Sequence, residues 1–487
     1  MNTSVIKYIL GKVMVISGGL MLLPCLVGLL YREPHGLYFL IVGLTSAVMG
    51  ELLTIKGLKN KNFGIKEGSI ATGLSWIVLS FIGCLPFYLS GEISSFIDAL
   101  FETVSGFTTT GASILDDVEC LSHCMLFWRS FTHWIGGMGI LVFILAILPM
   151  SGGSSLNIMK AESPGPSVGK LVPKIKETAS WLYKIYIGLT VAEMLLLLCG
   201  GMNLFEASTM TFGTAGTGGF GITNSSCGGY NMYCQWVITI FMILFGVNFN
   251  FYFFMVFRQF KKAISMEEVR RYLEIIVIAV ILIVINIYKM CDGLFDAISK
   301  ASFQVASIIT TTGYSTTDFD LWPHFSKTIL LWLMFIGACA GSTGGGTKVS
   351  RVMTWVRTTK KELSSYIHPR GVKKVRVDGK IVEHDVVRSI NVYYAAFFGV
   401  FAVSVFLISM ENYDFTTNFS AVAATINNIG PGFSLVGATC NFGFFNPFSK
   451  LVFIFDMLAG RLELFPMLML LYPAVYKEMG KKVIKKI

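Results

Sequence analysis

Two nearly identical tetrapeptides, at residues 108–111 and 310–313, carry the pattern in this sequence best suited to coordinating a cation. Both read Thr-Thr-Thr-Gly, and a phenylalanine, Phe101 or Phe303, stands ten residues before the glycine in each. Glycine permits backbone dihedrals that other residues resist, so such a run can turn its carbonyls inward, and the hydroxyls can add further oxygens. A ring of oxygens can replace the hydration shell of a monovalent cation. The chemistry predicted is therefore cation coordination, if further segments complete the ring.

Two other glycine segments could complete it. Residues 214–221 read Thr-Ala-Gly-Thr-Gly-Gly-Phe-Gly, and residues 426–433 read Ile-Asn-Asn-Ile-Gly-Pro-Gly-Phe. We align Gly219 with the glycines of the threonine runs because an aromatic residue follows it, and Gly218 is the alternative. We align Gly430 because the proline after it fixes a turn.

The residues predicted to coordinate the cation contribute main-chain carbonyls, with hydroxyls in the threonine runs. They are Thr108, Thr109, Thr110, Gly111, Thr217, Gly218, Gly219, Thr310, Thr311, Thr312, Gly313, Asn427, Asn428, Ile429 and Gly430.

The composition indicates the environment of these segments. Of the 487 residues, 54% are hydrophobic and only 14% are charged, whereas a soluble globular protein carries about 25% charged residues. The chain is therefore predicted to cross a membrane several times, with lipid as its surroundings. The net charge of +10 is explained by Lys and Arg in cytoplasmic loops, so no nucleic acid partner is predicted.

Ten apolar runs are long enough to span a bilayer. They lie at about 13–30, 37–55, 69–90, 125–149, 181–200, 233–257, 273–289, from 326 onward, 389–409 and 448–475. Four segments between them are too short to span, and each leads into one of the glycine motifs: 97–110, 204–219, 294–313 and 415–430. The linkers rich in Lys and Arg place both termini in the cytoplasm and let the short segments enter from outside.

A segment that enters a membrane without crossing it must be buried in protein or line water. Four such segments can satisfy one another by meeting around a common axis; the alternative is that they are outer loops or interfacial helices. The predicted fold is an all-α polytopic membrane protein. It has two N-terminal transmembrane helices and four helix–pore loop–helix repeats in a pseudo-fourfold arrangement around one central pore. The predicted units are 1–60 for the N-terminal helices and, for the repeats, 61–160, 161–262, 263–375 and 376–487.

These features resemble a known family. The Thr-Thr-Thr-Gly runs, the Asn-Asn-Ile-Gly-Pro-Gly segment and residues 311–318 (Thr-Thr-Gly-Tyr-Ser-Thr-Thr-Asp) resemble the Trk/Ktr/HKT potassium transporters. The two additional N-terminal helices make the resemblance strongest to the TrkH-type subunits. Sodium-permeating members of that superfamily carry serine at the first filter glycine. This chain has Gly111, so the resemblance implies potassium.

The resemblance also implies the surroundings of the subunit. It implies a homodimer in the bacterial cytoplasmic (inner) membrane, with a cytoplasmic ring of nucleotide-binding, TrkA-like regulatory subunits as its partner. K⁺ is then the transported ion, and no bound organic cofactor is expected in this chain.

The second helix of the third repeat is predicted to be interrupted. Residues 335–348 read Phe-Ile-Gly-Ala-Cys-Ala-Gly-Ser-Thr-Gly-Gly-Gly-Thr-Lys, and so many glycines cannot hold a regular helix. The alternative is a helix end followed by a cytoplasmic loop. The resemblance implies an intramembrane gating loop, with gate residues Gly337, Gly341, Gly344, Gly345 and Gly346.

Arg461 is the second predicted part of the gate. It lies about halfway along the last apolar run, where a charge is costly and usually faces a pore or a partner. The alternative is an ion pair with Asp456, Glu463 or an acid on another helix. The resemblance implies an arginine that projects into the pore just inside the filter and repels cations leaving it.

Other polar residues are assigned structural roles. Glu102 and Glu206 are predicted to be buried hydrogen-bond partners, His133 and Trp134 to be packing residues, and the acids of 116–119 to form a solvated loop. No metal cluster or nucleophile–base pair is evident at membrane depth, which argues against an enzyme. The predicted function is uptake of potassium, a monovalent cation, through a gated pore. The alternative is an ion-coupled secondary symporter driven by protons or sodium.

Overall fold

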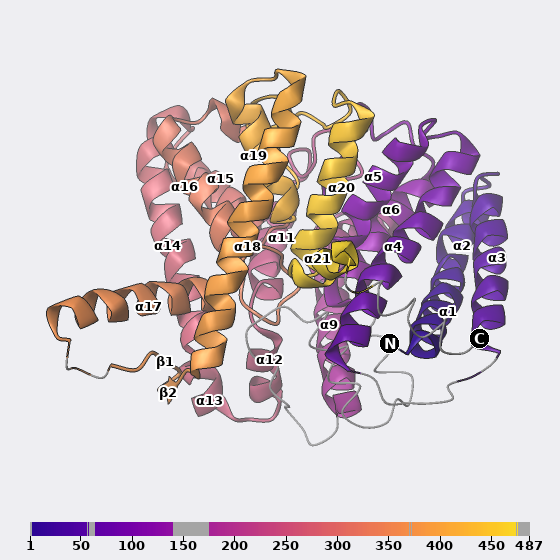
Figure 1. Ribbon diagram of the computed structural model, residues 1–487. Helices are drawn as coiled ribbons and strands as arrows, with labels where there is room; N and C mark the ends of the chain where they lie inside the picture. The colour runs from indigo at the N-terminus through magenta and orange to yellow at the C-terminus, as the bar shows by residue number, and fades with distance from the viewer. Residues whose placement is uncertain are drawn as a thin grey trace.

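The computed structural model describes residues 2–55, 57, 64–139, 175–369, 371, 373–473 and 475, and these residues are almost entirely helical. Figure 1 shows the longer helices running side by side between the upper and lower ends of the molecule. Within the described residues, six helical stretches are long and apolar enough to cross a membrane: Thr3–Leu30, Gly36–Thr54, Ile65–Ser90, Ala179–Cys199, Glu267–Met290 and His384–Glu411. The chain is thus an all-helical, multi-pass membrane protein.

The N-terminal helices pack through glycine. α1 (Thr3–Leu20) and α2 (Leu22–Leu30) lie against α3 (Gly36–Thr54). A Cβ atom on Gly11 would lie 2.6 Å from the carbonyl oxygen of Gly50, so only glycine allows this approach, as is common between helices in lipid. The first helix begins at the third residue, ten residues before the predicted start of the first run.

Four short helices occur within the four segments that the sequence marks as too short to span: α5 (Phe96–Phe107), α10 (Leu204–Gly216), α15 (Leu294–Ile309) and α19 (Phe415–Ile426). Three of them begin at a residue whose side chain accepts a hydrogen bond from the first turn: Ser95, Asn203 and Asp414. All four helices end in a turn that contains residues with positive φ, described below. The residues of the turn therefore determine where each helix stops.

The run predicted at 233–257 is apolar enough to span, but it is bent. α11 (Met232–Phe245) and α12 (Phe249–Val256) are separated by a bend of 91°. The side chain of Asn248 accepts a hydrogen bond from the N–H of Asn250 at 3.0 Å. It thereby caps the second helix at a point where the first has ended.

The predicted continuous run at 448–475 is also interrupted. α20 (Pro447–Arg461) ends partway along this run, and α21 (Phe465–Leu471) starts after a turn in which Glu463 and Leu464 have φ of 58° and 66°. The N–H of Leu464 donates to the carbonyl of Ala459 at 2.7 Å, which closes the turn.

The two remaining helices that follow a short helix are α6 (His123–Met138) and α16 (His324–Ile336). α16 ends at Gly337, where the sequence predicts an interruption. The predicted run at 125–149 lies outside the described residues from 140 onward. Among the described residues, six helices and one bent pair are long and apolar enough to span, compared with ten predicted spanning runs, one of which was predicted to be interrupted.

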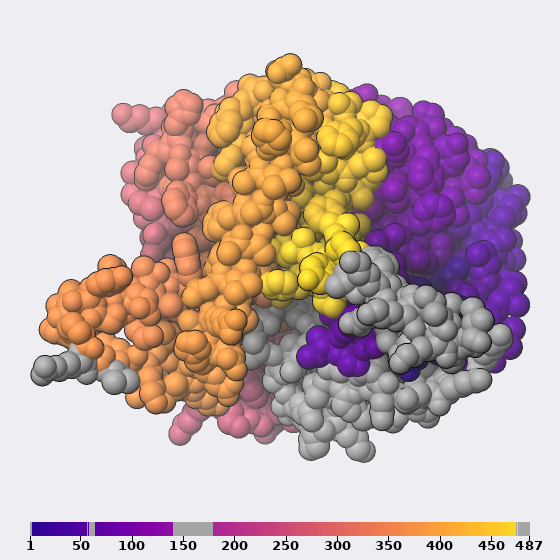
Figure 2. Space-filling view, viewed as in Figure 1, coloured from indigo at the N-terminus to yellow at the C-terminus, as the bar shows by residue number. Residues whose placement is uncertain are grey.

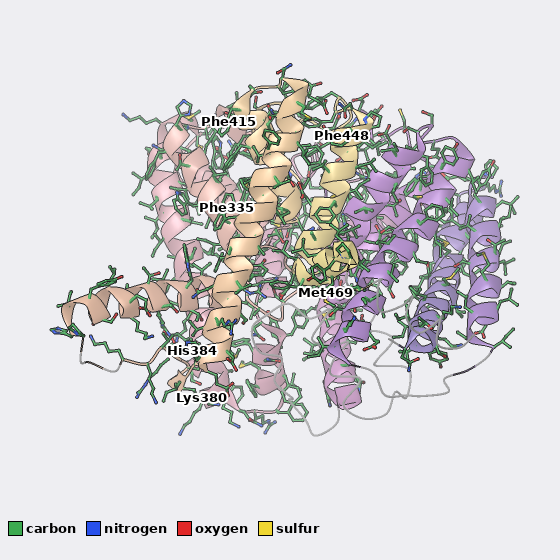
Figure 3. The ribbon with its side chains drawn as sticks, in the orientation of Figure 1. Phe335, Lys380, His384, Phe415, Phe448 and Met469 are labelled. Atoms are coloured by element: carbon green, nitrogen blue, oxygen red, sulfur yellow. The ribbon has the colours of Figure 1, made fainter. Side chains whose placement is uncertain are left out.

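The other elements surround this core or extend from it. They are α4 (Ile65–Ser90), α9 (Ile175–Cys199), α13 (Phe260–Ser265), α14 (Glu267–Ile287), α17 (Val349–Ile367), α18 (His384–Ile408) and the antiparallel strands β1 (Arg376–Val377) and β2 (Lys380–Ile381). Figures 1 and 2 show α17 projecting sideways near the lower end of the molecule. Figure 3 shows Lys380 and His384 at that end, whereas Phe415 and Phe448 lie near the opposite one.

Candidate cation site

The four short helices end in turns with one common backbone conformation. We call residues 108–111, 216–219, 310–313 and 427–430 the first to fourth glycine turns. In the first turn the N–H of Thr109 donates to the carbonyl of Gly106, three residues earlier, and the N–H of Thr110 donates to the carbonyl of Ser105, five residues earlier. The other three turns have the same two bonds at the equivalent positions. This is the bonding pattern of a Schellman motif, and it occurs in all four turns although their sequences differ.

The dihedrals identify the equivalent residues. The final glycine has φ of +80°, +79°, +88° and +100° in Gly111, Gly219, Gly313 and Gly430. Gly218 is not among the residues with positive φ. The structure thus resolves the choice that the sequence left open, and Gly219 is the equivalent of Gly111.

Each turn also contains a left-handed residue that is not glycine. Two positions before the final glycine, φ is +55°, +56°, +60° and +55° in Thr109, Thr217, Thr311 and Asn428. A β-branched residue in this region is a genuine outlier, and such residues concentrate at functional sites because the surroundings must hold them there. The strain is therefore carried by the three threonine-containing turns, whereas asparagine adopts this conformation readily in the fourth.

The four turns contact one another in a closed cycle. A Cβ atom on the final glycine of one turn would lie against the carbonyl oxygen that precedes the final glycine of the next turn. The distances are 2.0 Å from Gly111 to Gly218, 2.0 Å from Gly219 to Thr312, 2.1 Å from Gly313 to Ile429 and 2.8 Å from Gly430 to Thr110. Glycine is required at all four positions by contact as well as by φ, and the cycle returns to its starting turn.

Main-chain oxygens are the chemistry that all four turns share. The hydroxyls of Thr108 and Thr110 lie 2.8 Å apart, and those of Thr310 and Thr312 lie 2.7 Å apart. The first hydroxyl of each pair also donates to its own helix, at 2.6 Å in both cases. The hydroxyls of these two pairs are therefore already engaged, and that of Thr110 also accepts from the side-chain amide of Asn428 at 3.0 Å, whereas the buried hydroxyl of Thr109 has no hydrogen-bond partner among the described residues. The C-terminal ends of four helices meet here, and their partial negative charge favours a cation.

Residues 337–348, which we call the glycine loop, lie against the third and fourth turns. The N–H of Gly345 donates to the hydroxyl of Thr311 at 2.6 Å. A Cβ atom on Gly345 would lie 2.6 Å from the carbonyl oxygen of Asn427, and one on Gly344 would lie 2.9 Å from that of Thr310. The loop that the sequence marks as a candidate gate is therefore in direct contact with two of the turns.

Glu268 holds both ends of the glycine loop, and sequence reasoning missed it. Its carboxylate accepts from the N–H of Ala340 at 2.7 Å and from the N–H of Ser350 at 3.1 Å. The side-chain amide of Asn248 donates to it at 3.2 Å. An acid at the start of a predicted span was the available signal, but its partners lie 72 and 82 residues away in sequence.

Arg461 is buried and binds main-chain carbonyls. It donates to Thr343 in the glycine loop at 2.8 Å, and to Gly136 and Gly137 in α6 at 2.5 and 2.7 Å. The ammonium of Lys348, also buried, donates to the carbonyl of Gly344. Two basic side chains thus lie at the loop.

The acids considered as ion-pair partners of Arg461 bind other groups. Asp456 accepts from the hydroxyl of Ser404 at 2.7 Å, and Glu463 binds Arg351. The guanidinium of Arg351 also lies 4.2 Å from the ring centroid of Tyr393. The ion pair that forms at this break is therefore between Arg351 and Glu463.

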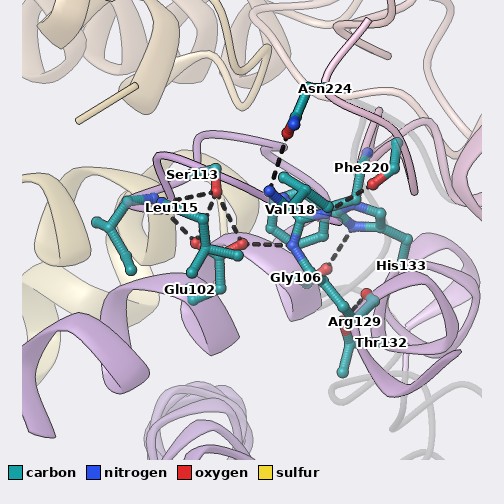
Figure 4. Close-up of polar contacts among 12 residues, drawn as sticks. Glu102, Gly106, Ser113, Leu115, Val118, Arg129, Thr132, His133, Phe220 and Asn224 are labelled. Atoms are coloured by element: carbon teal, nitrogen blue, oxygen red, sulfur yellow. Dashed lines mark hydrogen bonds and ion pairs between the residues drawn. The ribbon is translucent and has the colours of Figure 1, made fainter. Parts of the chain in front are cut away.

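A polar cluster behind the first two turns is larger than the sequence indicated (Figure 4). Glu102 is a buried hydrogen-bond partner, as predicted, and binds Arg129 at 2.5 Å and the hydroxyl of Ser113 at 3.0 Å. His133, predicted to be a packing residue, makes two hydrogen bonds. Glu206 instead caps the start of α10 by accepting from the N–H of its N-cap residue at 3.2 Å.

The acidic loop at 116–119 is held by hydrogen bonds within the loop and to Asn224 of another loop. The Cys120 thiol, the Asn224 side chain and the N–H of Glu119 all donate to Asp117 and lower the pKa of that carboxyl below its usual value. The charge of Asp117 is therefore retained at neutral pH.

Comparison with known proteins shows the family to which this chain belongs. The family model described as TrkH, a cation transport protein, matches residues 35–476. The chain belongs to the TrkH family. Its relatives include the Trk system potassium uptake protein TrkH of Salmonella typhimurium, 35% identical over 98% of this chain and all of that protein. TrkG of Escherichia coli K12, also named a Trk system potassium uptake protein, is 34% identical over 96% of this chain and 98% of that one.

A solved structure agrees with this assignment. The crystal structure of the potassium transporter TrkH from Vibrio parahaemolyticus superimposes with a TM-score of 0.87 at 33% identity, covering 98% of this chain and 100% of that one. Membership of the TrkH family makes the chain a transport protein rather than an enzyme.

The anchoring of the glycine loop can be tested at Glu268. Replacing Glu268 with alanine leaves the N–H groups of Ala340 and Ser350 without their acceptor, and each unpaired group costs about 1–3 kcal/mol. We expect a lower midpoint of thermal unfolding for the detergent-solubilised protein, measured by loss of the monodisperse chromatographic peak. Glu274→Ala, which removes an exposed ion pair with Arg271 on the same helix, is the control and should leave the midpoint nearly unchanged. Equal midpoints for the two variants would contradict the anchoring role.

Proposed function

We propose that this protein takes up potassium through a pore whose selectivity filter is formed by the four glycine turns. The observation that carries the proposal is the closed cycle of four turns with one backbone conformation, at the ends of four short helices. Oxygens arranged around a common axis replace the water of a permeating ion. The relatives of this chain are named potassium uptake proteins, and the potassium assignment rests on them and on Gly111.

The proposed architecture is two N-terminal helices followed by four helix–pore helix–helix units around one central pore. The N-terminal helices lie within 1–60, and the four units are 61–160, 161–262, 263–375 and 376–487. The equivalent conformation of the four turns supports a pseudo-fourfold axis. The filter residues are those of the turns, with Gly219 as the second filter glycine.

The glycine loop and Arg461 form the proposed gate. The contacts of Gly345 with Thr311 and of Arg461 with Thr343 tie the loop to the turns and to α6 and α20. Opening requires these hydrogen bonds to break while Glu268 keeps the ends of the loop in place. A buried positive charge near the path of the ion raises the barrier to cation passage.

The regulatory surroundings follow from the same arrangement. α17 begins at Val349, immediately after the loop, and extends away from the body near the end that carries Lys380 (Figures 1 and 3). We propose that this end faces the cytoplasm of a bacterium, that both termini lie there, and that nucleotide-binding, TrkA-like subunits dock on it. Movement of α17 would then act on the loop. The exposed apolar side chains of Leu363, Tyr366 and Ile367 on this helix support a homodimer that covers them.

The filter is tested by replacing Gly313 with serine. A Cβ atom there would lie 2.1 Å from the carbonyl oxygen of Ile429, so the third and fourth turns must move apart and fit the ion less closely. We expect the ratio of rubidium to sodium uptake into proteoliposomes to fall by about tenfold or more, the change that 1.4 kcal/mol of lost discrimination produces. Gly399→Ser is the control, because no atom lies within 4 Å of a Cβ atom at Gly399. An unchanged ratio in a monodisperse G313S protein would refute the filter assignment.

The gate is tested at Arg461. Removing the charge in Arg461→Ala should raise cation flux by about tenfold, which corresponds to a barrier lower by ~1.4 kcal/mol. Arg461→Lys keeps the charge and should stay near the wild-type rate. Rubidium uptake into proteoliposomes measures both variants at matched protein content. Flux in the alanine variant that equals or falls below the wild-type flux would rule out the barrier role.

A further inference from the structure

α6 is wedged between the short helices of the first two glycine turns. A Cβ atom on Gly136 would lie 1.8 Å from the carbonyl oxygen of Phe107, at the end of α5. One on Gly137 would lie 2.7 Å from the Cα atom of Gly216, in the second turn. The helix thus approaches both turns as closely as backbones can, and its side chains on this face lie directly behind them.

His133 lies on that face and bridges the two short helices. Its Nδ1 is 2.7 Å from the carbonyl oxygen of Gly106, and its Nε2 accepts from the N–H of Phe220 at 3.2 Å. A carbonyl oxygen only accepts and a backbone N–H only donates, so the partners assign the neutral tautomer with its proton on Nδ1. The side chain is fully buried. Figure 4 shows both bonds.

The imidazole occupies the space of a missing side chain. A Cβ atom on Gly218 would lie 2.2 Å from both Cγ and Nδ1 of His133. At the equivalent position the first and third turns carry Thr110 and Thr312, whose hydroxyls bond within their own turns. The second turn has glycine at this position and lacks that hydroxyl pair. Its unusual sequence is therefore matched to the ring of His133.

The residues that follow the second turn are held by the same face of α6. Arg129, one helical turn before His133, donates to the carbonyl of Gly221 at 2.8 Å, and its guanidinium lies 3.7 Å from the ring centroid of Phe220. Glu102 in α5 binds Arg129, which ties the support of the second turn to the first. Gly219 is thus followed directly by a residue whose N–H and ring are both fixed.

We propose that His133 is the positioning residue of the second glycine turn and that ion selectivity depends on its acceptor nitrogen. The proposal rests on the filter function proposed above. The Nε2 acceptor fixes the N–H of Phe220 and with it the adjacent carbonyl of Gly219, in the turn that lacks threonine support. Without this bond the carbonyl of Gly219 is less firmly positioned, and the filter formed by the four turns discriminates less well between potassium and the smaller sodium ion.

Two isosteric variants separate the two hydrogen bonds. His133→Gln places an amide oxygen near the position of Nε2 and can still accept from Phe220. His133→Asn places its amide near Nδ1 and cannot reach Phe220. The ratio of rubidium to sodium uptake into proteoliposomes should fall in the asparagine variant by about two- to tenfold, the range that one hydrogen bond supplies. It should stay near the wild-type ratio in the glutamine variant.

Trp134→Phe is the matched control. It removes a hydrogen bond from the neighbouring residue of α6 to Thr190, so a general loosening of the helix would lower the ratio there too. Equal ratios in the asparagine, glutamine and wild-type proteins would overturn the proposal while leaving the filter function intact. A wild-type protein that passes sodium as readily as rubidium would instead overturn the proposed function itself.

A double substitution tests the shared volume independently of the hydrogen bonds. Gly218→Thr alone collides with the imidazole, and we expect it to abolish uptake. Combined with His133→Ala, which vacates the space, the same threonine should restore uptake and reproduce the arrangement of the first and third turns. Failure of the pair to recover any uptake, or full uptake in the single G218T variant, would contradict the claim that the ring replaces a side chain of the second turn.

Discussion

Peptide groups that leave a helix within a membrane have no water to bind, and lipid offers them nothing. The four short helices of this protein end in largely buried turns, whose peptide groups likewise need partners within the protein, and much of the architecture follows from satisfying those ends. Each helix closes on itself with the same pair of hydrogen bonds. The remaining carbonyls then lie against the next turn, until the cycle is complete. One turn alone would leave its carbonyls exposed, so the four are stable only as a set.

The same constraint explains why the following helices are broken. α11 ends at the bend before Asn248, α16 ends before Gly337, and α20 ends at the turn that contains Glu463. α6 approaches two of the glycine turns through adjacent glycines. Breaks expose main-chain groups, and these become the partners of Arg461, Glu268 and Lys348. These buried charged side chains are retained because they bind main-chain groups that would otherwise be unpaired: three carbonyls for Arg461, two N–H groups for Glu268 and one carbonyl for Lys348.

The sequence predicted the parts of the site that local patterns encode. The four short segments and three of the four final glycines could be identified because glycine motifs follow apolar runs too short to span. The bends at 246–248 and 462–464 were not predicted, because each lies within a long, mainly apolar run and the positive φ near the second bend falls on Glu463 rather than on glycine. The roles of His133 and Glu268 were missed because the partners that define them, Phe220 for His133 and Ala340 and Ser350 for Glu268, are 72 to 87 residues away in sequence. A spacing signal existed for the first, since Arg129, His133, Gly136 and Gly137 recur at intervals that place them on one helical face.

The central claim, that the cycle of glycine turns selects potassium, is tested most directly with the unmodified protein. Purified protein in liposomes is given rubidium as tracer, with potassium or sodium added outside at equal concentration. Competition by potassium, together with tracer uptake that sodium leaves nearly unchanged, is the result that this account predicts. Sodium that competes as effectively as potassium would contradict it.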